Sequence, residues 1–233
     1  MKKITLLVIF STFWMIPVVT TAQKTSSVKL GLRVAPAICW INPNASDYES
    51  EGIRAGISAG LVSDFYFTEH YAISTGFSFL FPSGKISYPD RYDVDDIPMS
   101  GSLTRQCNFT YLEIPFMVKM KTNSFGMMSF FGQIGFGTGF RLKATAKDHF
   151  TPDLTPGQSV SEEQNINSTT TLMRESVLAG VGVEYKLDAS TRLFGGFNYS
   201  NSLNNLFTGT NQLSEEKEKG VLNFLELNIG ILF

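Results

Sequence analysis

Eight stretches of the chain alternate apolar side chains with small or polar ones, which is the period of a β-strand whose two faces meet different surroundings. One face collects Phe, Leu, Ile and Val, and the other collects Gly, Ser, Asn, Arg and Glu. The pattern predicts eight strands, which lie near residues 27–39, 53–67, 71–82, 106–121, 127–141, 173–187, 191–204 and 221–233.

The connections between these stretches alternate in length. Four are long, near residues 40–52, 83–105, 142–172 and 205–220, and three are short, near residues 68–70, 122–125 and 187–190. Short turns on one rim and long loops on the other are typical of an outer-membrane barrel. We therefore predict an all-β fold: an eight-stranded antiparallel up-and-down transmembrane β-barrel with short periplasmic turns and long extracellular loops.

Two other all-β folds compete with this interpretation. A soluble eight-stranded barrel such as a lipocalin would turn its apolar face inward around a ligand cavity. Glycine and serine suit the narrow inside of a small barrel, so the broad apolar face is better placed against lipid. A β-sandwich would not give such regular alternation of connection lengths.

The N-terminus has the layout of a secretory signal peptide. Lys2 and Lys3 precede an apolar run over Ile4–Val19, and the small residues of TTAQ follow. An uncleaved membrane anchor is the alternative, because the run is nearly long enough to span a bilayer. Pro17 and TTAQ favour cleavage, so residues 1–22 are predicted as a signal peptide and residues 23–233 as the barrel domain. Export and a lipid-facing barrel together predict the outer membrane of a Gram-negative bacterium.

The composition narrows the chemistry that the chain can perform. With 20 Gly, 20 Phe and 17% charged residues, it suits many strands and argues against disorder. A net charge of −2 makes nucleic acid an unsuitable partner. Cys39 and Cys107 both follow the signal region, so a disulfide is permitted, although they are expected on opposite walls of the barrel. His70 and His149 lack metal-ligand spacing, and no zinc site is predicted.

Two segments resemble a known family. YLEIPF, residues 111–116, is similar to a strand segment of the PorT-like outer-membrane β-barrel family of Bacteroidetes-type bacteria, and AQ after the signal region is in keeping with that group. The C-terminal NFLELNIGILF resembles the terminal strand that the outer-membrane assembly machinery recognises, which would make Phe233 an assembly signal. The resemblance implies an outer-membrane barrel and lends little on activity.

No motif predicts catalysis or a cofactor. GFGTGF and GVGVE look like phosphate loops, but no helical period follows either of them. DRYDVDDIP is expected to be a solvated acidic loop, with calcium as an open alternative at Asp90, Asp93, Asp95 and Asp96. No serine lies in a Gly-x-Ser-x-Gly motif, so an enzyme is not expected. An enzyme would become a candidate if His149 lay beside a serine or aspartate at the outer rim.

Charged residues on the polar faces are the best candidates for a site, and their role is expected to be structural. They lie at the alternate strand positions that are expected to face the lumen, and in a narrow interior such charges must pair. The predicted lumen network consists of Arg33, Arg54, Glu113, Arg174, Glu184, Arg192 and Glu226. An anion path lined by the arginines is the weaker alternative, because eight strands enclose little more than their own side chains.

We therefore predict a non-catalytic outer-membrane protein whose long surface loops have a structural or interaction role. The alternatives are a narrow channel or small-solute binder, and, by family resemblance, an accessory component of a protein-secretion apparatus. The expected partners are outer-membrane lipid, the outer-membrane assembly machinery and other envelope proteins that contact the loops. No cofactor or metal is expected.

Overall fold

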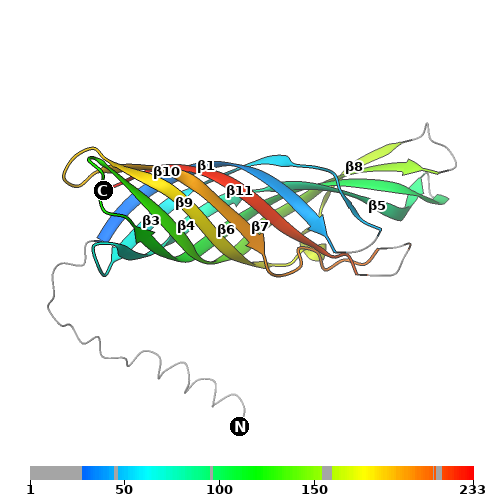
Figure 1. Cartoon of the computed structure of the whole chain (residues 1–233). Coiled ribbons are helices and arrows are strands. Elements are labelled where there is room, and N and C mark those ends of the chain that lie inside the picture. Colours follow the sequence, from blue (N-terminus) through cyan, green and yellow to red (C-terminus); the bar gives the residue numbers. More distant parts are fainter. Residues whose placement is uncertain (1–27, 45–46, 95–96, 154–158, 212, 214–216) are drawn as a thin grey trace, which may run out of the picture.

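The structure, a computed structural model, describes residues 28–44, 47–94, 97–153, 159–211, 213 and 217–233. Eight long antiparallel strands close into a ring (Figure 1). The predicted eight-stranded barrel is therefore confirmed. The ring runs through β1 (Val28–Pro43), β3 (Arg54–Tyr66), β4 (Tyr71–Phe81), β6 (Ile97–Lys121), β7 (Met128–Pro152), β9 (Met173–Lys186), β10 (Arg192–Ser202) and β11 (Gly220–Leu232), which pairs back to β1.

The predicted signal peptide and cleavage site lie outside the described residues. The three short turns, at 67–70, 122–127 and 187–191, lie at one end of the barrel together with the C-terminus (Figure 1). This arrangement of turns is the predicted one. Among the described residues, no helix is long and apolar enough to cross a membrane.

Two of the four long connections, those near residues 83–105 and 142–172, are themselves largely strand. β5 (Ser83–Val94) pairs with the outer half of β6, and β8 (Val160–Asn165) pairs with the outer half of β7. β2 (Glu49–Ser50) adds a short edge beside β5. Strands β5 and β8 extend past one end of the barrel (Figure 1). β8 carries polar residues on both faces, whereas β5 alternates buried Ile86 and Tyr88 with Lys85 and Ser87.

The outer wall of the barrel carries an apolar band. Leu32, Ile134 and Phe136 are 55%, 57% and 61% exposed, respectively, although all three lie in the middle of strands. A water-soluble protein rarely exposes so continuous an apolar surface. The band is instead what a lipid-facing wall requires. The alternate positions on the same strands, which carry glycine, serine and charged residues, therefore face the lumen.

A β-bulge marks the outer edge of this band. The pairing of β6 with β7 shifts between Thr110 and Tyr111, where Leu142 on β7 is skipped. As a result Leu142 and Lys143 are both exposed, one after the other. A bulge bends the strand and increases its local twist. The apolar wall therefore ends at Leu142, and the polar extracellular sheet begins at Lys143.

A separate apolar core closes the extracellular end. It gathers seventeen buried side chains from the strand ends and the connections, including Tyr88, Phe109, Phe150, Leu206 and Phe207. The connection after β10 contributes the last two of these. This core excludes water from the outer mouth of the barrel. The extracellular region is therefore a folded cap and not a set of independent loops.

Candidate functional site: the lumen charge network and the extracellular cap

Arg174 and Glu113 form a buried pair across one glycine. Arg174 Nη1 lies 2.8 Å from Glu113 Oε2, and the two residues are 3% and 3% exposed. Gly139 on β7 is the register partner of both Glu113 on β6 and Arg174 on β9. Gly139 thus places no side chain between the two charged residues in this row. At Gly137, the preceding glycine of GFGTGF on the same face, an added Cβ would lie 3.2 Å from the Glu113 carboxyl carbon. The glycines of GFGTGF therefore leave room for the charged side chains of the lumen.

Arg174 has three further contacts that hold it in place. Its Nε and Nη2 donate to the hydroxyls of Ser202 and Ser200, at 2.7 and 2.6 Å. Its guanidinium carbon lies 4.7 Å from the centre of the Phe224 ring. The cation therefore remains partly satisfied even without its carboxylate.

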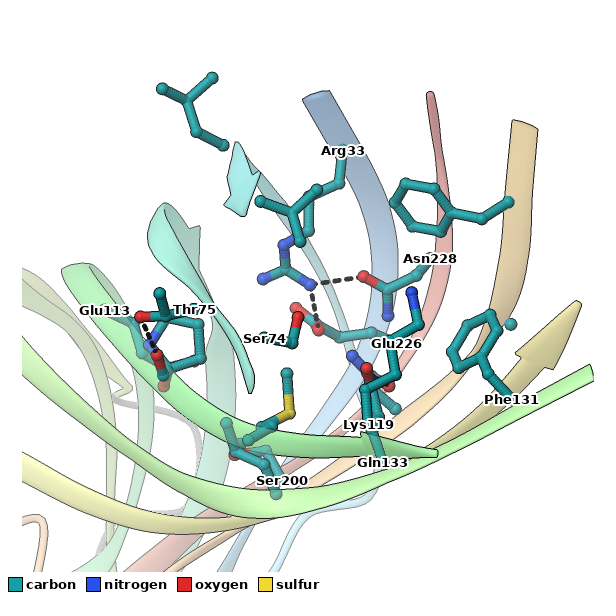
Figure 2. Close-up of a pocket in the computed structure, with 18 of the residues that line it drawn as sticks. Arg33, Ser74, Thr75, Glu113, Lys119, Phe131, Gln133, Ser200, Glu226 and Asn228 are labelled. Carbon is teal, nitrogen blue, oxygen red and sulfur yellow. Dashed lines mark hydrogen bonds and ion pairs between the residues drawn. The ribbon is translucent and has the colours of Figure 1, made fainter. Parts of the chain in front are cut away.

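Arg33 and Glu226 form a second pair between adjacent strands. Arg33 Nη1 lies 3.2 Å from Glu226 Oε2 and also donates to Asn228, as Figure 2 shows. Arg33 Nε donates to Ser78 at 3.0 Å, and Ser58 donates to the other Glu226 oxygen at 2.6 Å. Hydroxyl and amide groups thus satisfy the polar atoms that the ion pair leaves over.

Glu184 is the centre of the third group, nearest the periplasmic turns. Lys119 Nζ lies 2.6 Å from Glu184 Oε1 and 2.6 Å from Asp64 Oδ2. Lys121 and Arg192 approach the other Glu184 oxygen, at 3.4 and 3.2 Å. Three cations therefore share two carboxylates in a space where Glu184 is 1% exposed and Asp64 is fully buried.

The structure thus brings six of the seven predicted residues into three ion pairs, and it separates Arg54 from them. Arg54 makes no ion pair with any described residue, and its buried Nε has no hydrogen-bond partner. It lies opposite Cys39, which belongs to the apolar extracellular core. The predicted lumen network did not include Lys119, Lys121 and Asp64. Alternation could have found two of them, because Lys119 lies on the same face of its strand as Glu113, and Asp64 lies on the same face as Arg54.

A small cavity lies among these three charged groups. Its volume is about 50 Å³, enough for a few water molecules at about 10–15 Å³ each. Figure 2 shows Arg33 from β1, Glu113 and Lys119 from β6, Gln133 from β7 and Glu226 from β11 around it. The cavity is far below the 300–1,000 Å³ typical of small-molecule sites. The lumen is therefore filled by its own side chains.

Another charged cluster joins the cap to the barrel strands. Arg105 on β6 makes two bonds to Asp148 on β7, both 2.8 Å, and a 3.3 Å contact to Glu218. Tyr88 donates to Glu218 at 3.2 Å, and burial raises the pKa of the Tyr88 phenol. Burial also raises the pKa of Glu218, against the opposing effect of Arg105. The connection between β10 and β11 is therefore tied to the sheet through one buried carboxylate.

His149 does lie beside a serine. Its Nδ1 is 2.9 Å from Ser161 Oγ, and both side chains are exposed on the outer face of paired strands β7 and β8. A nucleophile of this kind needs a third group that orients the histidine and donors for an oxyanion. The neighbouring Asp148 is buried on the opposite face and bound to Arg105. His149 and Ser161 are cross-strand register partners on an open sheet surface.

The remaining predicted features lie apart from one another. Among the described residues there is no group of three or more His, Cys, Asp or Glu that could hold a metal. Asp90 is buried and Asp93 is exposed, and Asp95 and Asp96 lie outside the described residues. Cys39 and Cys107 are buried free thiols. Phe233 is 56% exposed, and its amide donates to Leu30.

The comparisons with known proteins agree with this architecture. The family described as outer membrane protein beta-barrel domain matches residues 21–208. No curated protein matches the chain.

The chain is similar to several solved structures at low identity. Neisserial surface protein A (NspA) is 11% identical, with 90% of this chain and 98% of that one covered and a TM-score of 0.46. Ail, the attachment invasion locus protein of Yersinia pestis, is 15% identical over 89% and 99%, with a TM-score of 0.37. OprG from Pseudomonas aeruginosa is 10% identical over 89% and 97%, with a TM-score of 0.39.

Proposed function

The chain belongs to the outer membrane protein β-barrel domain family and lies in the outer membrane of a Gram-negative bacterium, and on that premise we propose that it is a non-catalytic, non-conducting anchor that presents a folded binding platform at the cell surface. The observation that carries this proposal is the extracellular core. Seventeen buried apolar side chains hold the strand extensions and connections in one arrangement. A platform ordered in this way loses little conformational entropy when it binds a partner.

The platform has edges and tips at which a partner can bind. β8 pairs with β7 on one side and is an edge strand of the sheet on the other. An exposed edge offers unpaired backbone groups to an extended segment of another protein. Other envelope proteins are therefore the expected partners.

Photo-crosslinking in intact cells tests this role. A photoreactive amino acid at Glu162, an exposed position on β8, should give protein adducts, whereas the same group at Asn123, in a periplasmic turn, should not give those adducts. Absence of adducts at Glu162 and at further positions on the β8 edge would contradict the platform.

The channel alternative depends on the lumen, and a planar-bilayer recording tests it. Both the cavity volume and the apolar core favour a conductance near zero. A stable single-channel current would favour a narrow channel over a non-conducting platform as the function of this protein. The similarity of YLEIPF to PorT-like barrels supports the other alternative, an accessory role in protein secretion. Adducts from Glu162 to components of a secretion apparatus would favour it.

The non-catalytic part of the proposal centres on Ser161. A fluorophosphonate probe, which modifies activated serines, should leave the folded protein unlabelled. Labelling that the Ser161→Ala variant abolishes would show that His149 activates Ser161, and it would refute this part of the proposal.

A further inference from the structure

The lipid-facing wall of the barrel continues upward into a polar sheet surface. On β7 the outward side chains change from Phe140 and Leu142 to Lys143, Thr145 and Lys147. On β6 they change from Leu112 to Thr110, Asn108, Gln106 and Thr104 along the same face. Strands rise about 3.3 Å per residue. This surface therefore begins at the edge of the apolar band and extends over the level of the lipid headgroups.

We name this surface the outer polar face; it is formed by the outward side chains of β5, β6, β7 and β8 above the bulge. The strand registers arrange it in rows. One row is Lys85, Gln106, Lys147 and Glu163, and the next is Ser87, Thr104, His149 and Ser161. Neighbours within a row are about 4.8 Å apart, and successive rows are about 6.6 Å apart. The face is thus a regular grid of hydroxyl, amide and charged groups.

The chemistry of this face does not suit a protein partner. Protein interfaces depend on buried aromatic or aliphatic anchors at their centre. None of the exposed large apolar side chains of the described chain belongs to these two rows or to Thr110, Asn108, Lys143 and Thr145. Hydroxyl and amide groups in such a grid are instead suited to hydrogen bonds with the hydroxyls of sugars.

Two lysines on the face have no partner within the described part of the chain. Lys143 and Lys147 are exposed and take part in no ion pair there. Lys143 follows directly after Leu142, the last apolar residue of the β7 wall. The third lysine, Lys85, is 3.6 Å from Glu51. Free ammonium groups at this height are placed to bind phosphate groups at the membrane surface.

We propose that the outer polar face binds the phosphorylated saccharide headgroups of the glycolipid that forms the outer leaflet around the barrel. Lys143 and Lys147 contact phosphate groups, and Asn108, Gln106 and Thr145 hydrogen-bond to the sugars. The proposal does not depend on the platform function, because this face points sideways over the lipid and the platform uses the β8 edge and the tips.

The test uses the full chain, refolded in zwitterionic detergent, and a fluorescent, deacylated, phosphorylated lipopolysaccharide oligosaccharide as the probe. Anisotropy should show binding to the native protein. The Lys143→Ser/Lys147→Ser variant should bind at least about tenfold more weakly, since each lysine near an anionic surface contributes roughly fivefold. Lys217→Ser/Lys219→Ser, with the same loss of charge away from the face, should bind like the native protein.

Two further arms separate glycolipid recognition from simple charge attraction. Dephosphorylated oligosaccharide should bind more weakly, and phosphatidylglycerol micelles should compete poorly. Asn108→Leu/Thr145→Val, which keeps both lysines, should also weaken binding. Equal binding by the Lys143→Ser/Lys147→Ser variant and the native protein would overturn the proposal. So would competition by phosphatidylglycerol as strong as that by the oligosaccharide. Unheated gel mobility verifies that each variant is folded.

Discussion

Glu113→Ala should destabilise the barrel because it leaves Arg174 buried without its carboxylate. Removing one partner of a buried ion pair costs about 3–5 kcal/mol. The lower end applies here, since Arg174 keeps the hydroxyls of Ser200 and Ser202 and the ring of Phe224. We therefore expect the free energy of unfolding to fall by about 3 kcal/mol.

Urea unfolding of the refolded barrel measures this loss, with unheated gel mobility reporting the folded fraction. For an m value of about 2 kcal/mol per molar urea, the midpoint should fall by about 1.5 M. Glu163→Ala is the matched control. Glu163 is an exposed carboxylate on β8, and its removal should change stability by less than about 0.5 kcal/mol.

A double variant separates the pair from its two members. Glu113→Leu/Arg174→Met removes both charges and leaves neither stranded, so its stability should return close to that of the native barrel. An unchanged midpoint in Glu113→Ala would refute the reasoning, because it would mean that water or another group neutralises Arg174. A double variant as unstable as Glu113→Ala would show that side-chain packing, and not the ion pair, stabilises the lumen around Glu113 and Arg174.

Three further perturbations test other parts of the structure. Gly76 has φ +148°, and a Cβ there would lie 2.1 Å from the Leu61 carbonyl oxygen, so Gly76→Ala should cost about 1–3 kcal/mol in the urea assay. Gly126→Ala, which also has positive φ but open space around it, should cost less, and the reverse order would contradict the close approach. Burial raises the folded-state pKa of Glu218, so its stabilising contribution is complete below the usual glutamate pKa of about 4.3 and is lost as pH rises through the raised value. Hydrogen-exchange protection of the Glu218 amide, corrected for intrinsic rates, should fall over that window, and Glu218→Gln should remove the trend; protection independent of pH in the native protein would disprove the linkage. Burial raises the pKa of Cys107 to about 12, so iodoacetamide at pH 8 should modify it only after unfolding. Rapid labelling of the folded protein would show that the cap opens.

The YLEIPF segment shows how far parity reasoning reaches. Leu112, Ile114 and Phe116 face lipid and Glu113 faces the lumen beside an arginine, as alternation along the strand requires. Pro115 cannot donate to the ladder, and a proline within a strand is typical of a bulge or kink. The register of β4 with β6 omits Gly76 and Phe77 at this point, and Thr75 donates to the Pro115 carbonyl at 2.7 Å. The missing amide of proline is thus matched by a local gap in the ladder, while the one register shift between β6 and β7 lies near Thr110.

By itself the sequence determined the barrel and the direction in which each side chain points, because a strand in a membrane wall has one apolar and one polar face and the period of two is local. Alternation cannot say which charges meet, since pairing depends on the stagger between strands and on a gap such as Gly139 between Glu113 and Arg174. Nor could it show that β8 extends the sheet, because both faces of this strand carry polar residues, and in β5 the apolar face is short, with Ile86 and Tyr88 followed by Asp90. Only the tertiary structure brought the connection after β10 over the barrel mouth, where Leu206 and Phe207 find an apolar core that no local pattern specifies.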